Sequence, residues 1–342
     1  MSTQTSILID PRFRDHEPGA SHPERPERIA VLEELLSSWT GPALERITPR
    51  LAAQEEVQNA HTQTLVSKIR ATQDLEHSRI DADTATSARS YETALLAAGG
   101  LLEVVDAVAD GATHNAFAFV RPPGHHATAE QAMGFCLFNN VAIAALHLRQ
   151  RGYERIAIVD FDLHHGNGTE AIFYDDPNVL YASLHQFPYY PGTGAADSQG
   201  RGAGLGYTVN VPFSAGVGDA GYLLAFAEII VPVLRQFRPD FLLVSAGFDC
   251  HRRDPLGGML VTEDGVVGMT RMLLDVARET CEGRLAAVLE GGYDLTAIRG
   301  SAEAMLGEMA REPEARQRRW ESPETDALEP LKNVLRPHWK LD

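Results

Sequence analysis

Short apolar runs alternate with longer amphipathic stretches along most of this chain. The apolar runs are rich in β-branched residues and have the length of buried strands; they cover residues 7–9, 115–120, 156–160, 179–184, 207–211, 241–246 and 285–289. The stretches between them have the helical period, and we expect helices at 29–39, 62–69, 91–108, 141–148, 221–237 (interrupted by Pro232) and 263–281. This alternation predicts the α/β class, with one doubly wound, mostly parallel sheet flanked by helices.

The remaining segments read as loops or as an extension. A polar, proline-rich loop at 12–28 carries His16 and His22, which we expect to be solvated or paired locally. His61 opens a predicted helix, where capping or packing is expected, and residues 80–90 read as a polar loop. From residue 311 the chain is charged and punctuated by prolines, and its last residues are expected to pack as a short helix. We therefore expect one domain over 1–342, with a core at about 15–310 and a packed C-terminal extension at 311–342.

The stretch from Ile156 to Thr169 carries the densest polar groups. Successive side chains on a strand point to opposite faces, so Asp160, Asp162 and His164 share one side. Two carboxylates and an imidazole at the end of a buried strand are costly to desolvate, and a bound cation removes that cost. A hydrogen-bonded acidic turn over a helix N-terminus is the alternative.

Further polar groups follow other predicted strands. They are His125 and His126 in R-P-P-G-H-H-A, Asp249 in G-F-D-C-H, and Tyr293 in E-G-G-Y-D. Ligands of parallel α/β sheets bind at the carboxyl ends of the strands, so we expect these segments to converge on one site. Exposed loop histidines and a core tyrosine with a paired hydroxyl are the alternatives.

The expected site suits hydrolysis at a metal. Asp162, His164 and Asp249 would supply three oxygen and nitrogen ligands and leave a position open for water and a substrate carbonyl, as in catalytic zinc sites; Fe(II) or another divalent ion is the alternative. His125 and His126 would supply general base and acid. Their available partners are Asp160, a charge, and Asn167, an amide, so the two imidazoles should titrate apart. Tyr293 would donate its hydroxyl to the developing oxyanion.

Composition narrows the class of partner. The formal net charge of -17 argues against nucleic acid, whose phosphates a protein must neutralise with basic side chains. The three cysteines do not suggest a disulfide framework. The N-terminus lacks a signal-peptide pattern, and we expect no apolar run long enough to span a bilayer. These features predict a cytoplasmic protein without a membrane partner and leave its oligomeric state open.

Five motifs in order resemble the zinc-dependent histone deacetylase superfamily. They are R-P-P-G-H-H-A, M-G-F-C-L-F-N-N, D-F-D-L-H-H-G-N-G-T, S-A-G-F-D and L-E-G-G-Y-D. They look most like its class II and bacterial deacetylase-like amidohydrolase branches, since class I members usually have an aspartate where Asn167 stands. The resemblance implies the arginase–deacetylase fold with a central eight-stranded parallel sheet. It also implies hydrolysis of N-acyl amides, usually acetyl-lysine in a peptide or protein, to amine and carboxylate.

The resemblance also assigns residues. It implies one zinc on Asp162, His164 and Asp249, the tandem histidines at His125 and His126 with Asp160 and Asn167 behind them, and the catalytic tyrosine at Tyr293. It implies an acyl tunnel bounded by Gly134, Phe135 and Tyr190, with Leu256 near the rim and Asp83 as a rim residue holding the substrate backbone. It implies one potassium site at Asp160, Asp162, His164, Ser183 and Leu184, and a second at Phe173, Asp176, Val179 and Tyr207.

Three other functions deserve comparison. An acetylpolyamine amidohydrolase, or one for another small acylated amine, would use the same site, but polyamine-selective relatives can carry an acidic residue where Leu256 stands. A binding module would keep the pocket without turnover, against which the intact histidine pair and Tyr293 argue. An arginase-like hydrolase of the same fold would hold two metal ions per chain.

Overall fold

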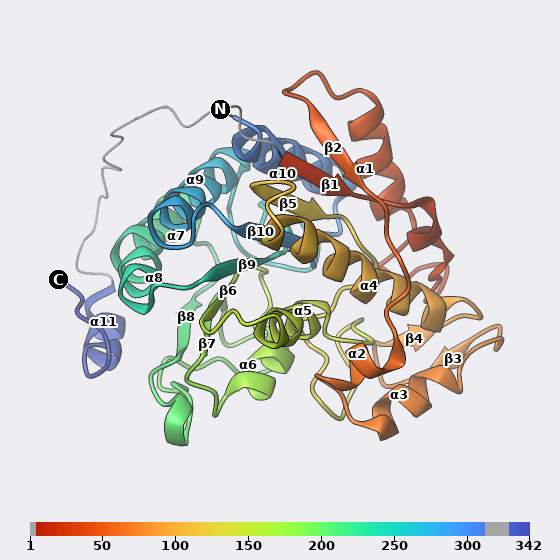
Figure 1. Cartoon of the computed structure of the whole chain (residues 1–342), viewed down its shortest axis with the longest axis horizontal. Helices are drawn as coiled ribbons and strands as arrows, with labels where there is room; N and C mark the ends of the chain where they lie inside the picture. The colour runs from red at the N-terminus through yellow and green to blue at the C-terminus, as the bar shows by residue number, and fades with distance from the viewer. Residues whose placement is uncertain (1–4, 312–327) are drawn as a thin grey trace.

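An eight-stranded parallel sheet forms the centre of the computed structural model, which describes residues 5–311 and 328–342 (Figure 1). Its strands lie in the order β2-β1-β5-β10-β9-β6-β7-β8, and every neighbouring pair is parallel. The strands are β1 Thr5–Leu8, β2 Leu44–Ile47, β5 Asn115–Ala118, β6 Ile156–Asp160, β7 Val179–Gln186, β8 Thr208–Phe213, β9 Phe241–Ala246 and β10 Leu285–Leu289. The predicted fold class is confirmed.

Helices cover both faces of this sheet (Figure 1). They are α1 Glu27–Ser37, α2 Gln54–Gln58, α3 Gln63–Arg70, α4 Ser90–Ala109, α5 Asn140–Gln150, α6 Asn167–Phe173, α7 Asp219–Ala225, α8 Val231–Phe237, α9 Glu263–Thr280, α10 Leu295–Met309 and α11 Glu329–Leu335. Strand side chains alternate between two hydrophobic cores: Val159 packs with α1 and α7 to α10, whereas Ile158 packs with α4 and α5. Burial on both faces explains why the strands read as continuous apolar runs.

In the part of the chain that the structure describes, six strands and α-helices are not predicted by the sequence pattern: α2, α6 and the four elements described next. The edge strand β2, L-E-R-I, has only two apolar residues and is not fully buried at any position. The short antiparallel hairpin of β3 (Ser78–Arg79) and β4 (Ala85–Thr86) lies within or beside the stretch expected to be a loop. Helix α10 is rich in alanine and glycine, so its buried face has a weak apolar period.

The segment Asp219–Phe237 stays helical through Pro232. The turn before the proline, Phe226–Ile230, widens into a π-turn, which is one way to accommodate a residue that lacks an N–H and crowds the preceding turn. Among the described residues, this 19-residue segment is long and apolar enough to cross a membrane by length and composition. The expectation that no run reaches that length was therefore wrong, although 61% of the segment's apolar window is buried inside the protein.

The C-terminal residues pack beside β8, the edge strand at one side of the sheet. Helix α11 places Leu335 in the core, and the Trp339 indole donates to the Gly206 carbonyl at 2.9 Å. Residues 312–327 of the predicted extension lie outside the described residues. Residues 328–342 pack on the core, and the single-domain division at residue 311 stays a prediction.

Candidate metal centre and active site

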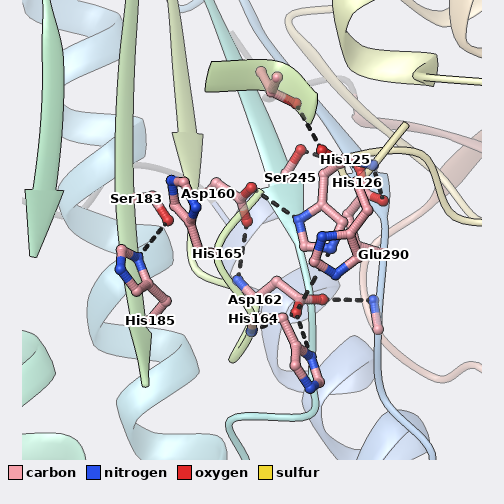
Figure 2. A network of polar contacts seen from close by, with 12 residues as sticks. His125, His126, Asp160, Asp162, His164, His165, Ser183, His185, Ser245 and Glu290 are labelled. Atoms are coloured by element: carbon pink, nitrogen blue, oxygen red, sulfur yellow. Dashed lines mark hydrogen bonds and ion pairs between the residues drawn. The ribbon is translucent and has the colours of Figure 1, made fainter. Parts of the chain in front are cut away.

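Three buried side chains from two distant segments meet at the carboxyl ends of β6 and β9. Asp162 and His164 follow β6, and Asp249 follows β9; one ligand atom from each lies within 4.8 Å of the others. His164 Nδ1 is 3.0 Å from Asp249 Oδ2 and 3.3 Å from Asp162 Oδ1. Figure 2 shows Asp162 and His164 beside the tandem histidines. The sequence prediction that these segments converge therefore agrees with the structure.

Backbone donors hold the carboxylates in place. Gly291 N–H donates to Asp162 Oδ2 at 2.7 Å, and Leu163 N–H donates to Asp249 Oδ1 at 2.8 Å. A Cβ on Gly291 would collide with both carboxylates, so only glycine permits this approach of β10 to the ligands. Each carboxylate keeps its other oxygen directed toward His164, which leaves a compact set of one nitrogen and two oxygen donors that fits a divalent ion such as zinc.

Charge balance at the ligands also fits a cation. Burial, reinforced by the negative charge of Asp162, raises the pKa of Asp249 to about 7. Although burial opposes it, the two carboxylates raise the pKa of His164 to about 10. The pKa of Asp162 is lowered despite its burial, because His125 and His164 stabilise its charge. Positive charge on neighbouring histidines therefore offsets the two buried carboxylates. A bound metal ion would supply that positive charge directly.

The tandem histidines have different partners. His125 Nδ1 lies 3.0 Å from Asp160 Oδ2, and His126 Nδ1 lies 2.8 Å from Asn167 Oδ1. Burial opposes charge on His125, but the carboxylates of Asp160 and Asp162 raise its pKa to about 10. Burial and the charge of His125 hold the pKa of His126 well below its usual range. The two imidazoles are therefore shifted in opposite directions, as their partners predict.

A cavity of about 230 Å³ opens beside these groups. It is lined by His126, His164 and Tyr293 together with the rim and wall residues Asp83, Gly134, Phe135, Tyr189, Tyr190 and Leu256. Every substrate-binding residue expected from the resemblance thus borders one cavity. His125 is absent from this lining; its Nε2 lies 3.8 Å from Asp162 Oδ1, and its ring contacts the His126 ring at 4.1 Å between centroids.

The walls of this cavity depend on unusual backbone. Gly134 and Phe135 both adopt positive φ, 57° and 68°, which is strained for an aromatic residue. A Cβ on Gly134 would collide with the His126 ring. The Phe135 N–H donates to Thr84 Oγ1 at 3.1 Å, which ties the strained turn to the β3–β4 hairpin.

Tyr293 is held from two sides. Its N–H donates to Asp254 Oδ2 at 2.6 Å, and the Arg28 guanidinium lies 5.1 Å from the centre of its ring. Arg28 also donates to the Gly292 carbonyl at 2.7 Å. These contacts hold Tyr293 in the lining of the cavity.

The residues expected to bind potassium lie in two groups. Asp160 and Ser183 are register partners of β6 and β7, next to the metal ligands, although Ser183 Oγ also contacts His185 Nδ1 at 2.9 Å (Figure 2). Phe173 and Asp176 lie at the end of α6. Val179 begins β7. Tyr207, just before β8, donates its N–H to the Gly204 carbonyl, and its own carbonyl accepts from Tyr181 N–H on β7.

Sequence reasoning missed several supporting residues. Glu290 accepts from Gly124 N–H at 2.7 Å, His125 N–H at 3.1 Å and Ser245 Oγ at 3.1 Å (Figure 2); burial raises its pKa to about 7. Glu290 stands in the motif L-E-G-G-Y-D, but the sequence alone does not predict that it accepts these hydrogen bonds. Tyr189, which stacks on His164 at 5.7 Å, could have been found as the neighbour of Tyr190.

The N-terminal loop also differs from expectation. His16 is buried rather than solvated, and contacts Ser90 Oγ at 2.7 Å and Glu24 at 3.4 Å. Glu24 forms fully buried ion pairs with Arg28 and Arg121. Because buried charges need partners from distant segments, the sequence alone does not reveal this cluster. His61 is buried and packs as expected, with Nδ1 2.9 Å from the Thr128 carbonyl.

Comparisons with known proteins agree with this geometry. The family model described as the histone deacetylase domain matches residues 22–309. A probable deacetylase of Archaeoglobus fulgidus is 43% identical over 297 residues, covering 85% of this chain and 82% of that protein. Histone deacetylase 15 of Arabidopsis thaliana is 42% identical (89% of this chain, 56% of that protein), and polyamine deacetylase HDAC10 of Homo sapiens is 39% identical (93% and 49%).

A solved structure gives the same result. The crystal structure of the HDA15 HD domain superposes with a TM-score of 0.90 at 39% identity, and the match covers 99% of this chain and 96% of that chain. This chain spans about half the length of the plant and human relatives. Its parallel sheet, its strand-end site and these matches show that the chain belongs to the histone deacetylase family and has the arginase–deacetylase fold.

Proposed function

We propose that this chain is a zinc-dependent deacetylase that hydrolyses N-acetyl or related N-acyl amides of lysine-type amines to free amine and carboxylate. The observation that carries the proposal is the buried triad of Asp162, His164 and Asp249, which meets His126 and Tyr293 at one cavity. The family is typically zinc-dependent, and the donor set fits that ion. We further propose one zinc per chain, which distinguishes the reaction from two-metal hydrolysis on the same fold.

Asp162, His164 and Asp249 would hold the zinc, whose chemistry there would be to polarise the acyl carbonyl and lower the pKa of a water molecule. His126 then acts as the general base, because it lines the cavity and its lowered pKa keeps it neutral. Its Nδ1–H donates to Asn167, so the Nε2 lone pair is the one available to take the proton from water. The same imidazole, once protonated, returns a proton to the leaving amine.

His125 and Tyr293 have electrostatic roles in this proposal. His125 keeps its proton, because Asp160 lies 3.0 Å from its Nδ1, and its positive charge supports the reacting atoms. Tyr293 donates its hydroxyl to the oxygen on which negative charge develops. Burial raises the pKa of Tyr293 well above its usual range, so it stays a donor.

The proposed substrate is an acylated lysine side chain of a peptide or protein. Leu256, which lines the cavity, is apolar at the position where polyamine-selective relatives can carry an acidic residue, and Asp83 is assigned to the substrate backbone by the resemblance. A small acylated amine is the alternative. We also propose potassium at the two predicted groups of residues, and a cytoplasmic location, with which three buried free cysteines are compatible.

The test combines activity with metal content on one purified sample. An acetyl-lysine peptide, an acetylated polyamine and longer acyl-lysine peptides are assayed side by side, while bound metal is counted per chain. We expect hydrolysis of the acetyl-lysine peptide, one divalent ion per chain, loss of activity with a chelator and recovery with zinc. Two ions per chain, or activity that survives complete metal removal, would contradict the proposal.

A further inference from the structure

A second cavity lies directly beside the acyl cavity. We call it the side groove; its volume is about 390 Å³, and its walls include Pro18, His22, Ala82, Asp83, Ala85 and Phe135. Asp83 and Phe135 also line the acyl cavity, so these two residues form the partition between the two spaces. Most of the surface that lines the side groove is apolar. An extended ligand leaving the acyl cavity over this partition therefore meets an apolar surface.

The partition is held by contacts from three segments. Glu24 N–H donates to His22 Nδ1 at 3.1 Å, so His22 carries its proton on Nε2 and donates it to the Asp83 carbonyl at 3.0 Å. The His22 ring meets Phe135 edge to face at 4.6 Å between centroids. His22 thus ties the loop at 16–24 both to the β3–β4 hairpin and to the acyl-cavity wall, and the side groove is formed before any substrate binds.

The hairpin side of the groove is equally fixed. Arg79 donates through Nε to the Asp81 carbonyl at 2.8 Å and through Nη2 to the Ala82 carbonyl at 2.6 Å. These bonds hold the turn that carries Ala82 and Asp83. The Arg79 guanidinium and the Asp83 carboxylate both border the groove, so its selectivity rests on its apolar surface rather than on a net charge.

We propose that the side groove binds the apolar side chain of the residue next to the acyl-lysine in a polypeptide substrate. This proposal rests on the proposed deacetylase function, because it needs the acyl-lysine to enter the acyl cavity. The lysine backbone then lies at the mouth near Asp83, and the next residue is one Cα spacing away, about 3.8 Å. Its side chain reaches across the partition into the side groove, where leucine or phenylalanine is desolvated.

A free acylated polyamine would not use this surface. It is a thin, unbranched chain with no apolar branch beside its acyl group, and burying its ammonium groups in an apolar groove would cost desolvation energy. The side groove therefore favours polypeptide over polyamine substrates, which sharpens the substrate class that the acyl cavity alone leaves broad.

The experiment uses the full chain loaded with zinc and matched acetyl-lysine peptides. The residue before or after the acetyl-lysine is leucine, glycine or lysine, and a small acetylated amine serves as a substrate too short to reach the groove. We expect kcat/KM for the best leucine peptide to exceed that for its glycine counterpart by about tenfold, the scale of selection that hydrophobic pockets achieve. The lysine peptide should not share this gain, because an ammonium is costly to desolvate in an apolar groove.

Two variants assign this preference to the side groove. Ala82→Trp fills it from an exposed position, so folding should be retained, and Ala203→Trp is a matched exposed control outside the groove. Ala82→Trp should abolish the leucine preference and leave the small amine unaffected, whereas Ala203→Trp should change neither. Equal rates for all peptides, or an equal loss on every substrate in Ala82→Trp, would contradict the proposal that the side groove binds this side chain. Hydrolysis of the small amine alone would do so while sparing the deacetylase function; failure on every substrate would overturn both.

Discussion

The metal centre and the rim of the cavity are built in different ways. At the centre, buried side chains after β6, β9 and β10 are bound to one another or to backbone from another strand, as Glu290 illustrates (Figure 2). At the rim, half-exposed residues such as Asp83 sit on a hairpin held through main-chain carbonyls. We therefore expect residues after the sheet strands to fix the chemistry, and hairpin residues such as Asp83 to adjust substrate binding with less effect on it.

The largest effect should come from the centre, through Tyr293→Phe. Phenylalanine keeps the ring packed against Phe135, 5.8 Å between centroids, and beneath Arg28. Only the hydroxyl that stabilises the oxyanion is lost, so kcat should fall by about 10²–10³-fold, while KM and bound metal stay unchanged. Steady-state kinetics with metal analysis measure this.

A neighbouring tyrosine provides the control for that variant. Tyr189 lines the same cavity, but its hydroxyl donates to the Leu256 carbonyl at 2.9 Å and is not aimed at the reaction. Tyr189→Phe should keep kcat within a few-fold of the parent, because it removes only one hydrogen bond from the cavity wall. Equal losses in the two variants would show that Tyr293 has no special part in the chemistry.

The second-largest loss of activity should come from Glu290, which holds the backbone at the first of the tandem histidines. Glu290→Ala leaves the N–H groups of Gly124 and His125 without their acceptor. The His125 backbone should loosen, and kcat should fall by about 10–100-fold, as for groups that orient catalytic side chains. Glu290→Gln keeps an oxygen for both N–H groups and an amide for Ser245, so it should recover most of the rate.

Metal content separates positioning from collapse of the centre in these variants. Both should bind the same amount of zinc, because Glu290 contacts none of the three proposed ligands in the described hydrogen-bond network. A glutamine variant as slow as the alanine variant would mean that the carboxylate charge, and not its hydrogen bonds, is what His125 needs.

The contrast between centre and rim also explains what could be predicted from the sequence. The sequence predicts that strand-end residues such as Asp162, His164 and Asp249 lie close together. The apolar runs predict a parallel sheet, and the carboxyl ends of parallel strands meet at one edge. The runs 241–246 and 285–289 coincide with β9 and β10.

The missed features depend on contacts between distant segments. His16 reads as a polar loop residue, yet it is buried beside Glu24, Arg28 and Arg121, whose charges compensate one another only after folding. The side groove likewise arises where the loop at 16–24 meets a hairpin about sixty residues later, and no local pattern records such a meeting.

A smaller effect concerns stability behind the centre, through His61. Burial lowers its pKa to about 4, and its Nε2 accepts the Asn139 N–H at 2.8 Å. Above its unfolded pKa of about 6.5 the imidazole is neutral in both states. As pH falls from there to 4, only the unfolded chain takes up the proton, so stability is lost across that window. His61 should account for about 2 kcal/mol of the decrease in free energy of unfolding between pH 7 and pH 5.

Urea unfolding at the two pH values isolates this contribution. His61→Gln cannot titrate, so its decrease in stability should be smaller than that of the parent by the His61 share, since the other histidines act alike in both proteins. His114→Gln, at an exposed position, should leave the decrease unchanged. The same pH dependence in His61→Gln as in the parent would show that burial does not hold this imidazole neutral.

The smallest effect is expected at the rim, through Asp83→Asn. Asparagine retains an oxygen for the Thr84 hydroxyl, which bonds Asp83 Oδ1 at 2.9 Å, and the Asp83 carbonyl still accepts from His22. What is lost is the charge that strengthens a hydrogen bond from the substrate backbone, so KM for acetyl-lysine peptides should rise by about 3–10-fold. The value of kcat should hold, because an interaction equal in ground and transition states affects binding alone. A small acetylated amine without a peptide backbone should show no change. If kcat fell and KM held, Asp83 would belong with the buried centre, and the division between a rigid chemical site and an adjustable rim would be drawn in the wrong place.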